Sequence, residues 1–281
     1  MADMFGQDFI ISALEVSLIM GLLLSYLGVH VVGRGIVFVD LALGQISMLG
    51  VAFANAFEKD PTVVSMVFAI GGAFLLSFIK VTDKRLKQEA IIGIVYAVAS
   101  ATTVLLISKA PHGESDISEV LFGSLFTVTS GQMESIAIVF AAIGLLHGIF
   151  RRKFFELTER IENHQSNNAG VFDFWNFLFY LSIGLAIVLA VRVGGVIPVF
   201  SYLVVPPVSA ILLTHGRKSL IILAMLVSLL GSFFGVYFSV QFDFPVGSSI
   251  VAMLGVLFFL GVLVRLLVSR KGQALGQTSA G

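Results

Sequence analysis

The chain has 281 residues, of which 57% are hydrophobic and only 12% are charged, and its formal net charge is zero. A soluble domain would carry about twice that fraction of charged residues, so the composition indicates a membrane protein. We expect no basic face for nucleic acid. The chain has no cysteine, which excludes a disulfide framework, a thiolate metal site and a cysteine nucleophile.

Nine apolar segments are each about as long as the 20 residues that a helix needs to cross a bilayer. They cover residues 9–32, 36–56, 62–81, 89–109, 131–150, 174–191, 196–214, 218–241 and 247–268. Because the loops between them are short, we predict an all-α polytopic bundle of about nine transmembrane helices in one domain, residues 1–271. The small polar residues at 272–281 predict a disordered tail.

The basic residues predict how this bundle is oriented. All but three of the 17 lysines and arginines fall in gaps on one side, and the exceptions are Lys59, Lys109 and Arg192. Such a bias marks the cytoplasmic side. We therefore expect the N-terminus outside and the C-terminus in the cytoplasm. The N-terminus also lacks the basic region of a cleaved signal peptide, so the first segment is expected to remain as a span.

Two stretches do not fit the simple count of spans. Residues 118–129 are apolar but too short to cross, and they predict a half-helix or an interfacial segment. The longest inner loop, residues 150–173, contains FELTERIE at 155–162 and predicts a short surface helix. A structured cytoplasmic segment suggests a docking site for a soluble partner, although a plain solvated connector would look the same.

Polar residues within the spans are candidates for function, because charges at membrane depth are costly. Glu15 lies in the first span, and Asp40 and Gln45 lie in the second, with Asp40 expected at mid-depth. A structural role stays open for Glu15 and Asp40. Polar residues near span ends reach water by snorkelling, so we assign structural roles there. These are His30, Arg34 and His147.

The seventh span contains the pair Pro206 and Pro207 at its middle. Two adjacent prolines remove two amide donors and clash with the preceding turn, so we expect the helix to break or kink there. Carbonyls freed at membrane depth need protein or water as partners, and such breaks tend to line cavities. The pair is therefore a candidate for a transport pathway.

Catalytic motifs are absent from the sequence. There is no Gly-Lys dipeptide and hence no phosphate-binding P-loop, and there is no HExxH, GxSxG or dinucleotide fingerprint. The chain is predicted not to be an enzyme and to need no cofactor. If it carries out active transport, the energy must come from a partner or from an ion gradient.

Five segments in chain order together resemble the ABC-3 family of metal-ion permeases, the membrane subunits of bacterial zinc, manganese and iron importers. The resemblance lies in LGVHVVGRGIVFVDLALGQISMLGVAFA (27–54), KQEAIIGIVYA (87–97), SDISEVLFGSLFTVT (115–129), GGVIPVFSYLVVPPVSAILL (194–213) and DFPVGSSIV (243–251). It implies a multi-pass permease of the bacterial inner membrane, surrounded by lipid. It also implies a homodimer with the pathway at its interface, cytoplasmic ABC ATPase subunits, and an extracytoplasmic metal-binding protein.

The resemblance also carries site expectations. The family's ATPase-docking segment falls by position at 154–170, which assigns docking to Glu156, Thr158, Glu159, Arg160 and Glu162. The transport pathway is assigned to Glu15, Asp40, Gln45, Pro206 and Pro207. The metal ligands are not assigned, because two family residues, an Asp and a His, fall at Leu41 and Gln45 here.

Other transport classes stay open. A permease for a metal chelate, such as a siderophore, haem or cobalamin, would need no naked histidine ligand, and glutamine is a poor ligand for a transition metal. A proton-coupled secondary transporter could use Glu15 or Asp40 as its proton site. A purely structural membrane subunit is a third class.

Overall fold

The computed structural model describes residues 7–78, 88–108, 123, 125–162 and 173–278, with side chains as far as Val268. All regular elements in these ranges are helical. They are α1 (Asp8–Arg34), α2 (Val39–Ala56), α3 (Pro61–Phe78), α4 (Gln88–Ile107), the short 3-10 helix η2 (Leu125–Thr127), α6 (Ser130–Ile149), α7 (Arg151–Glu162), α8 (Phe174–Gly194), α9 (Val196–Leu213), α10 (Arg217–Phe242) and α11 (Val246–Thr278).

Nine of the described helices, all but η2 and α7, are long and apolar enough to cross a membrane. The prediction of an all-α bundle with nine spans is therefore confirmed. Local chemistry sets the helix ends. Helix α1 stops at Gly35, whose φ of 65° is left-handed and whose N–H bonds back to Val31 and Val32. A capping box between Thr129 and Gln132 starts α6.

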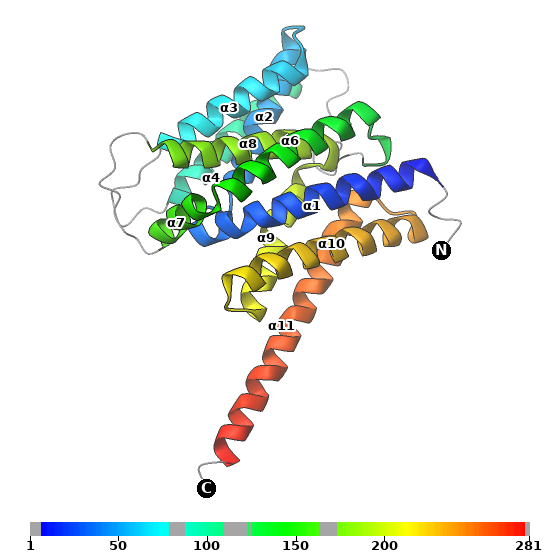
Figure 1. Cartoon of the computed structure of the whole chain (residues 1–281). Helices are drawn as coiled ribbons and strands as arrows, with labels where there is room; N and C mark the ends of the chain where they lie inside the picture. Colours follow the sequence, from blue (N-terminus) through cyan, green and yellow to red (C-terminus); the bar gives the residue numbers. More distant parts are fainter. Residues whose placement is uncertain (1–6, 79–87, 109–122, 124, 163–172, 279–281) are drawn as a thin grey trace.

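Helix α1 runs through the middle of the bundle, with α6 on one side and α10 on the other (Figure 1). It also packs against α9, while α2 pairs with α3 and α4, and α3 with α8. Helix α11 packs on α9 and α10 and then leans away from the other helices (Figure 1). Helices α4 and α11 bury the smallest share of their residues, so they leave the most apolar surface for lipid.

Helices α10 and α11 approach each other closely at two glycines. A Cβ atom built on Gly231 would lie 2.3 Å from a side-chain carbon of Leu254, and one on Gly235 would lie 2.5 Å from the Cα of Ile250. Small residues at this spacing allow such contact between membrane helices. The GxxxG stripe therefore has a packing role within the chain.

Of the break or kink predicted at Pro206 and Pro207, the break is wrong, because α9 is one helix from Val196 to Leu213 with both prolines inside it. Pro207 has no N–H to donate to the Leu203 carbonyl. That carbonyl instead faces Gly28 of α1, where an added Cβ would lie only 2.1 Å from the oxygen. Protein thus covers this freed acceptor, and the helix continues past both prolines.

The two irregular stretches differ in outcome. The surface helix predicted at 155–162 is confirmed as part of α7. Half of the segment at 118–129 lies outside the described residues, and its described part holds only the 3-10 turn η2. Helix α11 continues to Thr278, past the start of the expected tail at residue 272. Lys, Gln, Ala and Leu are good helix formers, and extending an existing helix is easy.

Candidate functional site

The predicted site residues fall into three separate places. We call the end of the bundle that holds α7 and the last residues of α1 the α7 end (Figure 1). Glu15 precedes Arg34 by nineteen residues on α1, or roughly 28 Å at the rise of an α-helix, so it lies near the opposite end. Asp40 and Gln45 begin α2 close to the α7 end. The structure therefore does not bring Glu15 together with Asp40 and Gln45.

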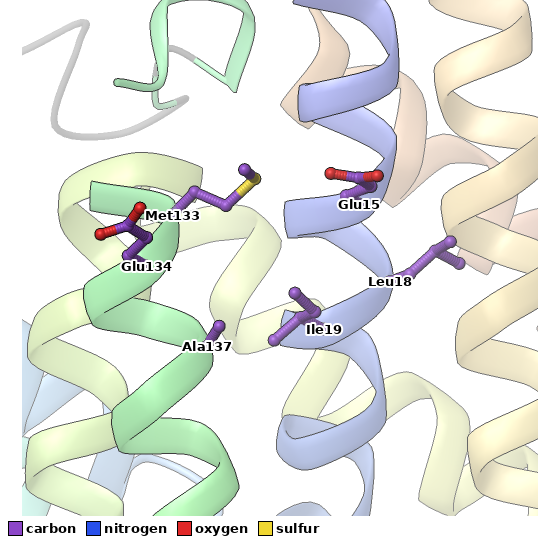
Figure 2. A pocket seen from close by; sticks show the side chains of 6 residues that line it. All are labelled: Glu15, Leu18, Ile19, Met133, Glu134 and Ala137. Carbon is purple, nitrogen blue, oxygen red and sulfur yellow. The ribbon is translucent and has the colours of Figure 1, made fainter. Parts of the chain in front are cut away.

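Glu15 borders an open groove of about 370 Å³ between α1 and α6 (Figure 2). Leu18, Ile19, Met133 and Ala137 supply most of its apolar lining, and Met133 points across the gap toward Glu15. A second carboxylate, Glu134 in the first turns of α6, also lines the groove, with its oxygens turned away from α1. Glu15 is exposed and forms no ion pair with any described residue.

The second group is at the start of α2. Asp40 is buried, only 2% exposed, and its Oδ1 has no hydrogen-bond partner among the described residues. The expected mid-depth position was wrong, because α2 begins at Val39 and Asp40 lies in its first turn. There the N-terminus of the helix favours a negative charge. Gln45 is also buried and lies five residues further on.

Pro206 and Pro207 are buried in α9. Pro207 lies six residues before the end of α9, and Gln45 lies six residues after the start of α2. Since α2 and α9 contact each other, this register places the glutamine and the proline pair at comparable depth. An amide and two prolines can shape a path, but they offer little for metal coordination.

The third group is on α7, which is amphipathic. Phe154 and Leu157 face the bundle, whereas Glu156, Glu159, Arg160 and Glu162 are exposed. Glu156 pairs with Arg160 at 2.7 Å, and Glu159 pairs with Arg217 at the start of α10. The assignment of Thr158 to a docking surface needs correction, because this residue is buried against the bundle.

Around Thr158 the structure shows a polar cluster that sequence reasoning missed. His30 and His147 are fully buried and Arg34 is 6% exposed, so none of the three reaches water by snorkelling as predicted. Arg34 Nε donates to Thr158 Oγ1 at 3.1 Å, and His30 Nδ1 lies 2.9 Å from the same oxygen. The four-residue spacing of His30 and Arg34, which puts both on one helix face, was the available signal.

Arg34 is held on its other side by α8. Its Nη1 donates to Asn176 Oδ1 at 3.3 Å, and its Cζ lies 3.3 Å from the centre of the Phe179 ring. Nη2 has no partner among the described residues. A cation over an aromatic face gains electrostatic stabilisation. The guanidinium therefore serves as an anchor for neighbouring helices.

Within the described ranges, no three His, Asp or Glu side chains gather closely enough to hold a metal ion. The carboxylates in these ranges therefore form no three-residue site with one another or with the histidines. Asp40 is the buried carboxylate among them, and Glu15 is an exposed one.

Comparison with known proteins agrees with this architecture. The sequence model of the ABC 3 transport family matches residues 6–265. The manganese transport system membrane protein MntC of Listeria monocytogenes is 26% identical over 273 residues, covering 95% of this chain and 96% of that protein. The probable iron transport system membrane protein of Haemophilus influenzae is 26% identical over 263 residues, covering 92% and 91%.

A solved structure described as PsaBC from Streptococcus pneumoniae in complex with Fab has a similar fold. Its TM-score is 0.77 at 25% identity, and the match covers 92% of this chain and 94% of that one. The nine membrane-spanning helices and the family match lead to the same conclusion. The chain belongs to the ABC 3 transport family and is a multi-pass membrane component of an ABC transporter rather than an enzyme.

Proposed function

We propose that the protein is the permease subunit of a bacterial inner-membrane ABC importer for a divalent transition metal: zinc, manganese or iron. The observation that carries the proposal is the family match over nearly the whole nine-span bundle. It is supported by relatives matched over nearly their whole length that are named as manganese and iron transport membrane proteins.

The proposed pathway runs along α2 and α9 and is completed by a second copy of the chain. Glu15 and Glu134, in the groove between α1 and α6, stand at the outer end of the bundle, where exposed carboxylates attract cations. Asp40, Gln45 and the pair Pro206–Pro207 line the part nearer the α7 end. An extracytoplasmic metal-binding protein would deliver the ion to the outer end, and lipid would surround the apolar faces of α4 and α11.

Energy enters at the opposite end in this proposal. Cytoplasmic ATPase subunits dock on the exposed charges of α7, which are Glu156, Glu159, Arg160 and Glu162. Glu156 pairs with Arg160, and Glu159 pairs with Arg217, so a partner meets a partly fixed pattern of charge. Closure of the ATPases would displace α7 and rock the spanning helices, opening the pathway alternately to each side.

One observation favours a metal chelate as an alternative substrate. Gln45 occupies a position at which the resemblance expects histidine, and glutamine is a weak ligand for a bare transition metal. A chelate would need a shaped path rather than ligands. A proton-coupled secondary transporter is less well supported, since exposed Glu15 and buried Asp40 lie at different ends of the bundle.

Reconstitution with its partners tests the proposal. The chain is co-expressed with a candidate ABC ATPase subunit from the same organism, purified, and placed in liposomes that contain a metal-sensitive dye. We expect ATP-dependent movement of Mn²⁺, Zn²⁺ or Fe²⁺ that stops when the catalytic glutamate of the ATPase is replaced. Movement without ATP that follows a pH gradient would establish the secondary transporter. Movement of a chelate but of no bare ion would establish the alternative substrate.

A further inference from the structure

The hydroxyl of Thr158 is the meeting point of two helices that are far apart in sequence. It donates to the Phe154 carbonyl within α7 at 3.0 Å. A threonine hydroxyl has one proton and two lone pairs, so this oxygen can accept two further hydrogen bonds. Arg34 Nε and His30 Nδ1 of α1 provide them. The hydrogen-bonding capacity of Thr158 is therefore fully used.

The contact between His30 and Thr158 is compatible with this assignment. With the Thr158 proton donated to Phe154, His30 donates from Nδ1 to the oxygen at 2.9 Å. In a neutral ring, Nε2 is then an acceptor, and the Tyr26 hydroxyl lies 3.3 Å from it. Tyr26, His30 and Thr158 thus form a continuous series of hydrogen bonds. A shift of α7 along α1 would break several hydrogen bonds together.

Further contacts tie this centre to other helices. Arg34 reaches Asn176 of α8, whose side chain donates to the Ser77 carbonyl of α3 at 3.4 Å. On the other side of α7, Arg217 at the start of α10 makes two contacts. It pairs with Glu159, and its guanidinium lies over the Phe155 ring. Helix α7 is therefore clamped between the end of α1 and the start of α10.

We propose that Thr158, His30 and Arg34 form a polar latch that makes α7 and the end of α1 move as one body during transport. These are positioning residues, since they act by passing a displacement of α7 to α1. Helix α1 in turn packs on α9 and α10, so the displacement reaches the proposed pathway. The coupling role rests on the proposed function, whereas the latch itself does not.

The polar character of the latch gives it this role. An apolar contact can slide by a few tenths of an ångström at little cost. A buried donor that loses its acceptor carries its full desolvation penalty, so Arg34 and His30 resist any slip between the two helices. If Thr158 only filled space, an isosteric apolar side chain would replace it without effect.

Three variants separate these roles. Thr158→Val keeps the shape and removes the hydroxyl, whereas Thr158→Ser keeps the hydroxyl. The matched control is Thr103→Val in α4, since Thr103 is equally buried at 6% exposure and donates to the carbonyl four residues earlier, at 2.9 Å. No other hydrogen bond involves the Thr103 side chain in the described part of the chain.

Two measurements are made on the full complex. We expect backbone amides of α7 to exchange with deuterium about tenfold faster in Thr158→Val, because unsatisfied donors favour local opening. Metal moved per ATP hydrolysed should fall about tenfold, with co-purification of the ATPase retained. Thr158→Ser should restore both values, and Thr103→Val should leave both unchanged.

Each other result decides against part of the proposal. Unchanged exchange in Thr158→Val refutes the latch. Faster exchange with an unchanged ratio of transport to hydrolysis refutes the coupling role and leaves a structural clamp. If the wild-type complex moves no metal with ATP, the proposed function fails and the coupling role fails with it, while the exchange comparison still decides on the latch.

Discussion

The two ends of helix α1 carry polar residues in opposite environments. Glu15 is exposed in a groove beside α6, whereas His30 and Arg34 are buried and hydrogen-bonded to α7. In the sequence, apolar residues surround the polar ones at both ends of α1. Lipid and protein are equally apolar neighbours, so hydropathy locates a membrane helix without revealing which of its faces meets protein. Only the partner residues on other helices distinguish the two ends.

The prediction with the largest expected effect concerns which side of the membrane each end faces, with the α7 end expected in the cytoplasm. A reporter that is active only in the cytoplasm should be active when fused after Lys271 and silent when fused between Lys109 and Glu119. The reason is the bias of basic residues toward the α7 end. Activity assays of both fusions in whole cells check this. The reverse pattern would place α7 outside the cell and remove the ATPase-docking proposal.

The covered half of α1 should be intolerant of added volume. In Gly28→Ala the new Cβ meets the Leu203 carbonyl at 2.1 Å, so two backbones must separate. We expect a loss of about 1–3 kcal/mol of stability, typical of overpacking, seen as lower abundance and a lower midpoint of thermal unfolding in detergent.

Gly71→Ala in α3 is the matched control for this prediction. A Cβ there meets nothing within 4 Å, and alanine favours a helix over glycine by about 0.5–1 kcal/mol. The control should therefore raise the midpoint slightly. Equal responses of the two variants would mean that α1 and α9 are not packed as closely as described.

How far the sequence predicts this molecule depends on the physical constraint involved. The seventh span was expected at 196–214 and is found at Val196–Leu213, because bilayer thickness restricts length and hydropathy alike. The break at Pro206–Pro207 failed because the carbonyl that Pro207 leaves free is covered by Gly28 of another helix. The latch at Thr158 was missed for the same reason, since His30 and Arg34 are more than a hundred residues away.

Asp40, in the first turn of α2, tests whether a buried carboxylate near the α7 end takes part in transport. In Asp40→Asn the buried oxygen loses its charge, which removes a burial cost, so abundance should be normal. If Asp40 lines the pathway, metal uptake should fall about tenfold or more because a cation loses its anionic ligand. Asp60→Asn, at the start of α3 where Asp60 caps two amides, is the control, since Asn caps as well as Asp. Normal uptake in Asp40→Asn would remove Asp40 from the pathway.

The smallest effect is expected at the open end of α1. Glu15→Gln should leave abundance and the unfolding midpoint within about 0.5 kcal/mol of wild type, as for other surface substitutions. Uptake at saturating metal should also be unchanged. At limiting metal, the rate should fall about two- to threefold, because an exposed carboxylate acts by raising the local cation concentration. Added salt should erase the difference, since a Debye length of about 8 Å at physiological ionic strength shortens further.

Glu134→Gln, on the opposite wall of the same groove, should behave alike. A loss at saturating metal in Glu15→Gln alone would instead mean that Glu15 binds the ion directly. A second copy of the chain would then have to close the groove over this residue.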